Sequence, residues 1–173
     1  MYGQTRLPAG VNNVKAIAGG EDHSLALRSD GSVVAWGMSG WGQISVPPGL
    51  AHVKAIAAGE YHNLALKVNG TVVAWGSGIF GLTNVLTIMT NVPASLSNVT
   101  AIACGISHNL ALKADGTVVA WGDNYAGETN VPADLSSVVS IAAGGRHCLA
   151  LRADGSVVAW GDRKSTRLNS RHG

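Results

Sequence analysis

Four histidines recur at a regular spacing, and histidine is the side chain that most often acts as an acid, base or metal ligand near neutral pH. The steps between them are 39, 46 and 39 residues, and each begins a His-x-Leu-Ala-Leu segment. A zinc site needs ligands that converge at close spacing, whereas these occur once per repeat and in phase with leucines. We therefore expect structural imidazoles, half-buried and bonded to backbone near the preceding Gly turn. They are His23, His62, His108 and His147.

The remaining residues whose side chains could take part in a reaction form no catalytic pattern. Cys104 and Cys148 fall at different repeat positions, which favours two small buried side chains that fill space in the core over a disulfide. The redox compartment of the protein is therefore left open. The Gly-x-Ser-x-Gly, phosphate-loop and metalloprotease motifs are missing from the sequence. We therefore expect a protein that is not an enzyme, with no catalytic residues, no metal and no cofactor.

The elements around each histidine form a repeat of about forty residues. Each copy continues through an Asx-Gly pair to Ala-Trp-Gly, and Asx-Gly between two apolar runs predicts a hairpin with a type I′ turn. No stretch shows a helical period. We expect the tryptophan of each copy to lie in the core, namely Trp36, Trp75, Trp121 and Trp160.

A two-residue turn at Asp30-Gly31 also predicts a register, in which Leu27 faces Val34 and Leu25 faces Trp36. One sheet face would then be bulky and the other small, so that copies stack bulky against small. The predicted bulky face holds Leu25, Leu27, Val34 and Trp36, and the small face holds Ala26, Val33 and Ala35.

A fourth strand is expected near Gln43–Val46 or Glu128–Val131. Four short antiparallel strands per unit, stacked face to face, are typical of β-propeller blades. The predicted fold class is therefore all-β, with about four blades of four antiparallel strands. A β-solenoid is the alternative, although it would not need a tight hairpin in each unit.

These residues resemble the regulator of chromosome condensation repeat, whose blade carries a Gly three residues before His-x-Leu-Ala-Leu, an Asp-Gly turn and a Trp-Gly. The resemblance covers nearly all of residues 2–162. The short unit is most similar to bacterial members, including the propeller-type β-lactamase inhibitory protein. The resemblance implies a closed propeller of about seven blades, a protein partner, and an extracellular or cell-surface location. The matching glycines are Gly20, Gly59, Gly105 and Gly144.

Four repeats against about seven imply a partial propeller. Both ends interrupt the pattern, and 163–173 resembles a translated sequencing adaptor more than a repeat, so we expect a non-native tail there. The alternative is a closed four-bladed ring in which the N-terminal segment completes the last blade; an open arc would expose edges that favour self-association. The expected divisions are 1–10 (tail of a preceding repeat), 11–50, 51–96 (with a seven-residue insertion), 97–135, 136–162 (incomplete) and 163–173.

The formal charge of +2 depends on the C-terminal tail. Without residues 163–173 the chain has 8 basic and 10 acidic residues, a net charge of −2, and the basic residues are scattered. A nucleic-acid surface needs clustered basic residues, so we expect no nucleic-acid partner. No apolar run is long enough for a membrane helix, so we expect no membrane insertion.

The positions that differ between copies lie directly before each His and after each Trp-Gly. Equivalent loops of a propeller share one rim, and exposed aromatic side chains on such loops are typical of protein-binding surfaces. Packing of these aromatics on the adjacent blade is the alternative. The candidate partner-binding residues are Glu21, Asp22, Trp41, Glu60, Tyr61, Phe80, Ser107, Tyr125 and Arg146.

We therefore predict a non-enzymatic module that binds a protein through loops on one rim. An architectural segment of a larger exported bacterial protein is the alternative. A β-lactamase inhibitor or a regulator similar to guanine-nucleotide exchange factors is a more distant hypothesis that depends on the resemblance alone.

Overall fold

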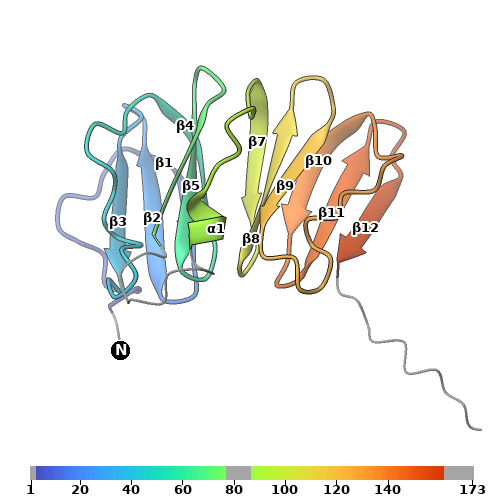
Figure 1. Ribbon diagram of the computed structural model, residues 1–173. Coiled ribbons are helices and arrows are strands. Elements are labelled where there is room, and N and C mark those ends of the chain that lie inside the picture. Colours follow the sequence, from blue (N-terminus) through green and yellow to red (C-terminus); the bar gives the residue numbers. More distant parts are fainter. Residues whose placement is uncertain (1–2, 77–86, 162–173) are drawn as a thin grey trace, which may run out of the picture.

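The computed structural model describes residues 3–76 and 87–161, which form four consecutive three-stranded antiparallel sheets. Each sheet is one blade, and the blades follow one another along an open arc in chain order (Figure 1). Blade 1 holds β1 (Val14–Gly19), β2 (His23–Arg28) and β3 (Val33–Gly37); blade 2 holds β4 (Val53–Ala58), β5 (His62–Lys67) and β6 (Val72–Gly76); blade 3 holds β7 (Val99–Cys104), β8 (His108–Lys113) and β9 (Val118–Gly122); blade 4 holds β10 (Val138–Ala143), β11 (His147–Arg152) and β12 (Val157–Gly161).

The predicted all-β propeller-blade architecture is confirmed, but each described sheet has three strands and not four. The segments expected to supply a fourth strand, Gln43–Val46 and Glu128–Val131, form turns and irregular backbone. The prediction failed because the backbone there bonds locally in turns and does not join the ladder of the blade: the Ser45 amide donates to the Gly42 carbonyl at 3.0 Å, and the Asn130 amide donates to the Gly127 carbonyl at 3.1 Å. One short helix, α1 (Thr87–Thr90), lies in the corresponding segment before blade 3.

The hairpin turn differs from the predicted type I′ turn. The Gly31 amide donates to the Arg28 carbonyl at 3.0 Å, and the Arg28 amide donates to the Ser32 carbonyl at 2.9 Å. Gly31 has φ of +82°, whereas Asp30 is not among the residues with positive φ. This is a three-residue loop, in which a type I turn precedes a glycine bulge. The predicted turn was therefore wrong.

The longer loop moves the hairpin register by one residue from the prediction. Leu27 pairs with Val33, Leu25 with Ala35, and Ser24 with Trp36. Each blade therefore presents two faces, which we name by their main residues. In blade 1 the Leu face carries Ala16, Ala18, His23, Leu25, Leu27, Val33 and Ala35, and the Trp face carries Ile17, Ser24, Ala26, Val34 and Trp36.

The blades stack with the Leu face of one against the Trp face of the next. Leu25 and Leu27 of blade 1 are fully buried against Val53, Ala65 and Trp75 of blade 2. The same arrangement joins blade 2 to blade 3 and blade 3 to blade 4. The core is thus divided into three layers between blades, as in other repeat proteins whose units contact only their neighbours.

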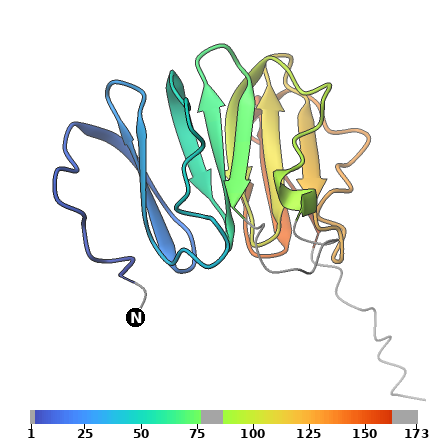
Figure 2. The same cartoon turned by 60° about the vertical axis from the view of Figure 1, so that its left-hand side comes forward.

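The arc is open, so the alternative of a closed four-bladed ring is wrong (Figure 2). The N-terminal segment packs on blade 1 and not on blade 4: the Gln4 carbonyl accepts hydrogen bonds from Trp36 Nε1 at 2.8 Å and from Ser24 Oγ at 3.0 Å. The carbonyls of Gln43, Met89 and Glu128 accept the corresponding tryptophan bonds in blades 2, 3 and 4.

Candidate functional site

The repeated histidines form hydrogen bonds between blades. His23 Nε2 lies 2.6 Å from Asn63 Oδ1, and His62 Nε2 lies 2.7 Å from Asn109 Oδ1. In the third contact His108 Nε2 lies 3.2 Å from the sulfur of Cys148. We expected bonds to backbone near the preceding Gly turn, and this was wrong for these three rings, because each reaches a side chain of the following blade.

The glycine three residues before each His leaves room for the ring. A Cβ added at Gly20 would collide with His23 Cε1 and would lie 2.6 Å from the carbonyl oxygen of Gly59 in the next blade. Gly59, Gly105 and Gly144 have the same relation to their own histidines. The Gly-x-x-His spacing therefore allows close contact between blades. Packing is thus the reason that this spacing recurs in every repeat.

Burial favours the neutral form of the rings of His23, His62 and His108. Loss of hydration lowers the pKa of His23, His62 and His108, and lowers that of His62 to about 4. A neutral ring whose Nε2 donates to Asn leaves Nδ1 as an acceptor, and Nδ1 of His23 and of His62 is buried without a hydrogen-bond partner. Such rings are poorly placed to exchange protons with a substrate.

The two cysteines are free. Burial raises the pKa of the Cys148 thiol to about 12 and also raises that of Cys104, so both are held as unreactive thiols. Within the described ranges 3–76 and 87–161, no three His, Cys, Asp or Glu side chains come together as a metal-binding group. The helix in the same ranges is too short to cross a membrane.

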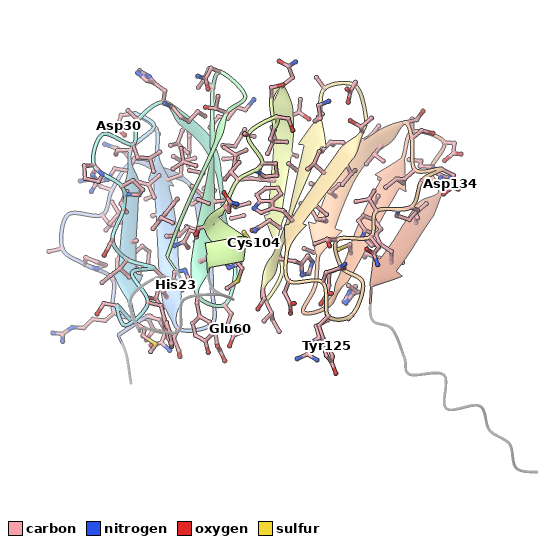
Figure 3. The ribbon with its side chains drawn as sticks, in the orientation of Figure 1. His23, Asp30, Glu60, Cys104, Tyr125 and Asp134 are labelled. Carbon is pink, nitrogen blue, oxygen red and sulfur yellow. The ribbon has the colours of Figure 1, made fainter. Side chains whose placement is uncertain are left out.

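The loops before the histidines gather at one end of the blades. They join the first and second strands of each blade, and they line one hollow of about 450 Å³ (the rim hollow). Figure 3 places Glu60 and Tyr125 at this end and Asp30 and Asp134 at the opposite end. The rim hollow is lined by Gly19, Gly20, Glu21, Ala58, Gly59, Glu60, Cys104, Gly105, Ile106, Ala143, Gly144 and Gly145.

Backbone hydrogen bonds connect these loops across blades. The Glu60 amide donates to the Ile106 carbonyl, and the Ile106 amide donates to the Gly145 carbonyl, both at 3.3 Å. The loops of blades 2, 3 and 4 therefore hold one another in place. A rim with such restraints changes little on binding, which reduces the entropic cost of forming a complex.

The aromatic loop of one blade contacts the loop before His in the next. The rings of Trp41 and Tyr61 lie 5.4 Å apart, and the Arg146 guanidinium lies 5.7 Å from the Tyr125 ring centre. Tyr125 is nonetheless 82% exposed. Contact with the adjacent blade and presentation to solvent are thus compatible. Phe80, predicted for the same surface, lies outside the described residues.

The rim hollow is acidic beside blades 1 and 2. The hydrogen bond to Glu60, together with the charge of Glu60, raises the pKa of Glu21. A hydrogen bond to Glu60 also raises the pKa of Tyr61, to about 12. Asp22 lies beside them and accepts from Gln4 Nε2 at 2.9 Å. The carboxyl groups of Glu21, Asp22 and Glu60 therefore lie together at the side of the rim hollow formed by blades 1 and 2. Arg146 lies at the side formed by blade 4.

Sequence reasoning missed the residues that complete these contacts. Asn63 and Asn109 bridge a histidine to a connecting segment: the Asn63 amide donates to the Gln43 carbonyl and the Asn109 amide donates to the Met89 carbonyl, both at 2.8 Å. A His-Asn pair in two copies was the available signal. Ile106, 42% exposed in the rim hollow, was also missed, because one apolar residue in a loop carries no pattern. Ser107, by contrast, is half-buried beside it.

Four segments of the chain match the family described as the regulator of chromosome condensation (RCC1) repeat: residues 14–43, 53–81, 99–128 and 138–163. Among solved structures, Prp20p from Saccharomyces cerevisiae, studied for its binding to Gsp1p and histones, is 26% identical with a TM-score of 0.72 over 89% of this chain and 46% of that chain. The ectodomain of the receptor kinase CR4 from Physcomitrella patens is 28% identical with a TM-score of 0.67 over 86% of this chain and 39% of that chain.

The ectodomain of the Arabidopsis thaliana receptor kinase ACR4 shares the fold, at 24% identity and a TM-score of 0.67 over 86% of this chain and 50% of that chain. A comparison with curated proteins finds no match. The chain spans about half the length of the first solved structures it matches, at 50%, 46% and 45% of those chains.

Proposed function

This chain belongs to the regulator of chromosome condensation (RCC1) repeat family, and from that premise we propose that it is a non-enzymatic module that binds a protein segment at the rim hollow. The observation that carries the proposal is that four successive blades contribute equivalent loops to one hollow of about 450 Å³. A concave surface built from loops on a rigid framework is a common form of binding site. Prp20p, a relative that binds Gsp1p and histones, supports a protein as the class of partner.

The rim hollow also indicates what its ligand should carry. Its floor is mainly glycine and alanine, which lets a peptide backbone come close, and Ile106 offers an apolar contact. Glu21 and Glu60 line one edge, and Tyr125 stands exposed at the other side of the rim. A segment with a basic residue near blades 1 and 2 and an apolar residue near Ile106 fits this arrangement.

The test is selection of peptides on the immobilised full chain from a random display library, followed by affinity measurement of the enriched peptides. We expect Glu60→Gln and Tyr125→Ala each to weaken binding roughly tenfold or more, because rim residues that anchor a ligand cost about 1.4 kcal/mol or more when removed. Enriched peptides should also carry more Lys and Arg than the starting library.

Matched controls lie at the opposite end of the blades. Val68→Ala removes an apolar side chain that is 67% exposed at a hairpin tip, and Asp134→Asn removes a charge. Both should leave affinity unchanged. Enriched peptides that respond to the controls and not to the rim variants would contradict the proposal. Failure to enrich any peptide would favour the architectural alternative.

A further inference from the structure

The contact between consecutive blades follows one pattern throughout the described chain. The Leu face supplies a buried histidine and two leucines, and the Trp face supplies a tryptophan, an alanine and the first valine of the blade. The leucines concerned in blades 1 to 3 are between 0% and 5% exposed. They are Leu25, Leu27, Leu64, Leu66, Leu110 and Leu112.

Blade 4 presents the same Leu face with nothing from the described residues covering it. Leu149 is 37% exposed, Leu151 is 38% exposed and Val157 is 64% exposed. His147, whose counterparts are 0–1% exposed, is also exposed, and in the described part of the chain its ring has no hydrogen-bond partner. The face is therefore complete in residue type, and no blade among the described residues stacks on it.

Blade 1 presents the complementary Trp face, on which no other described blade stacks, although Ala26 at its centre is buried. Ile17 is 79% exposed and Val14 is 38% exposed, whereas Val53, the counterpart of Val14 in blade 2, is 1% exposed. Leu7 of the preceding segment is 61% exposed. Ser24 occupies the position of Asn63 and donates to the Gln4 carbonyl at 3.0 Å, as Asn63 does to Gln43.

We propose that two copies of this chain associate head to tail, with the Leu face of blade 4 of one copy stacked on the Trp face of blade 1 of the other. The contact repeats the one that joins blades within the chain, so its geometry is already established three times. His147 would then lie against Ser24 of the second copy, as His23 lies against Asn63. This inference does not depend on the proposed function of the rim.

The shape of the arc gives the expected number of copies. The described blades form an open arc, and the chain spans 50%, 46% and 45% of the propeller chains it first matches (Figures 1 and 2). A head-to-tail contact makes a closed ring when its rotation returns to the start, and an open filament when it does not. Two arcs of about half a circle each would close as a dimer.

The experiment measures the molar mass of the full chain by light scattering over a range of concentrations. We expect a reversible dimer, because burying two apolar faces at each contact is favourable. Leu149→Asp should give a monomer at every concentration, since it places a charge in the stacked face. Circular dichroism would show that the variant stays folded, as expected for a side chain that is 37% exposed.

Val139→Asp is the matched control. Val139 is in the same blade and is 56% exposed, but its counterparts Lys15, Lys54 and Thr100 are exposed in every other blade, so stacking does not cover this position. This variant should dimerise like the original chain. Equal dimerisation of Leu149→Asp and Val139→Asp would overturn the proposal, because association would then use another surface.

A gain of affinity gives a second, independent test. Ser24→Asn supplies the side chain that accepts from the histidine at the two contacts between blades 1 and 2 and blades 2 and 3. The closed dimer contains two such contacts, so two additional buried hydrogen bonds should tighten dimerisation roughly twenty-five-fold. His147→Ala should abolish that gain. A chain that is monomeric at all attainable concentrations, both alone and as Ser24→Asn, would also overturn the proposal.

Discussion

At the residue scale, one glycine per blade sets how closely the histidine ring approaches the next blade. Gly20 has backbone of the following blade beside it, and any side chain there must displace both His23 and the Gly59 carbonyl. Because the second of these is backbone, relief would require the blades to separate. Gly19 next to it meets nothing within 4 Å.

Gly20 and Gly19 give a prediction for a matched pair of alanine variants. Gly20→Ala should lower the free energy of unfolding by about 3 kcal/mol, the upper range for overpacking. Gly19→Ala should be neutral or should stabilise by up to about 1 kcal/mol, because alanine restricts the unfolded chain. Chemical denaturation of both variants measures the difference. Equal stabilities would show that the close approach at Gly20 is not restrictive.

The buried histidines make stability depend on pH. His62 has a pKa of about 4 in the folded chain against 6.5 when exposed, so the unfolded state binds more protons between these values. Above pH 6.5 both states are neutral and this effect vanishes. Stability should therefore fall as pH decreases from about 6.5 to about 4, by roughly 3 kcal/mol for His62.

Urea unfolding across this pH range checks whether the free energy of unfolding falls as the pH decreases. His62→Gln should be less stable at pH 7 but should show a shallower decline, because one proton-binding difference is removed. A slope in His62→Gln equal to that of the original chain would contradict a buried neutral ring.

How much of this could be predicted from sequence differs between residues. Periodicity alone placed His23, Trp75 and Leu64 in packing roles, because a residue repeated in every copy meets the same neighbours in every copy. The hydrogen bond from His23 to Asn63 could not be predicted, because it joins residues 40 positions apart and depends on which blade face each occupies.

At the element scale, the Asp-Gly pair was correctly interpreted as a hairpin but assigned to the wrong turn. Both a type I′ turn and a type I turn with a glycine bulge accept Gly at the last position. The residue after Gly decides between them here: Ser32 donates its amide to Asp30 Oδ1 at 2.8 Å, which stabilises the longer loop. That bond is local, but the one-residue shift it causes moves Val34 and Trp36 from the face that carries Leu25 to the opposite face of the blade.

The hairpin tips also contact the next blade, and this can be measured. Gly116 has φ of +78° with the Val138 amide nitrogen 3.3 Å from an added Cβ, whereas Gly155 has φ of +85° with nothing within 4 Å. Both alanine variants incur the left-handed backbone cost of about 1–2 kcal/mol. Gly116→Ala should lose measurably more in thermal unfolding. Equal losses of thermal stability in the two variants would mean that blade 4 moves away from the added Cβ at Gly116 without an energetic cost.

At the scale of the whole molecule, stability is a sum of contacts between neighbouring blades, and the two end blades each have one neighbour. The rim also belongs to this scale. Its location followed from repeat equivalence, but the pairs Trp41–Tyr61 and Tyr125–Arg146 could not be predicted, because they depend on the offset between successive blades.

Native-state hydrogen exchange should reveal the unequal ends. β8 and β11 are both central strands of three-stranded sheets, but Leu110 in β8 is fully buried and Leu149 in β11 is 37% exposed. At concentrations low enough for a monomer, β11 amides should exchange faster, because blade 4 can open while the rest stays stacked. Uniform protection of both strands would indicate that the blades unfold only together.

The backbone carbonyls that accept a hydrogen bond from the tryptophan of each blade have a wider consequence. In each blade the tryptophan indole donates to a backbone oxygen 32 residues earlier, and the residue that carries this oxygen is Gln4, Gln43, Met89 or Glu128. Because the recognised group is backbone, the same bond forms whether the residue at this position is Gln, Met or Glu. The seven extra residues of the second repeat all precede Met89, so this spacing is unaffected. A foreign sequence inserted between Gly122 and Glu128 should therefore be tolerated as a graft beside the rim hollow.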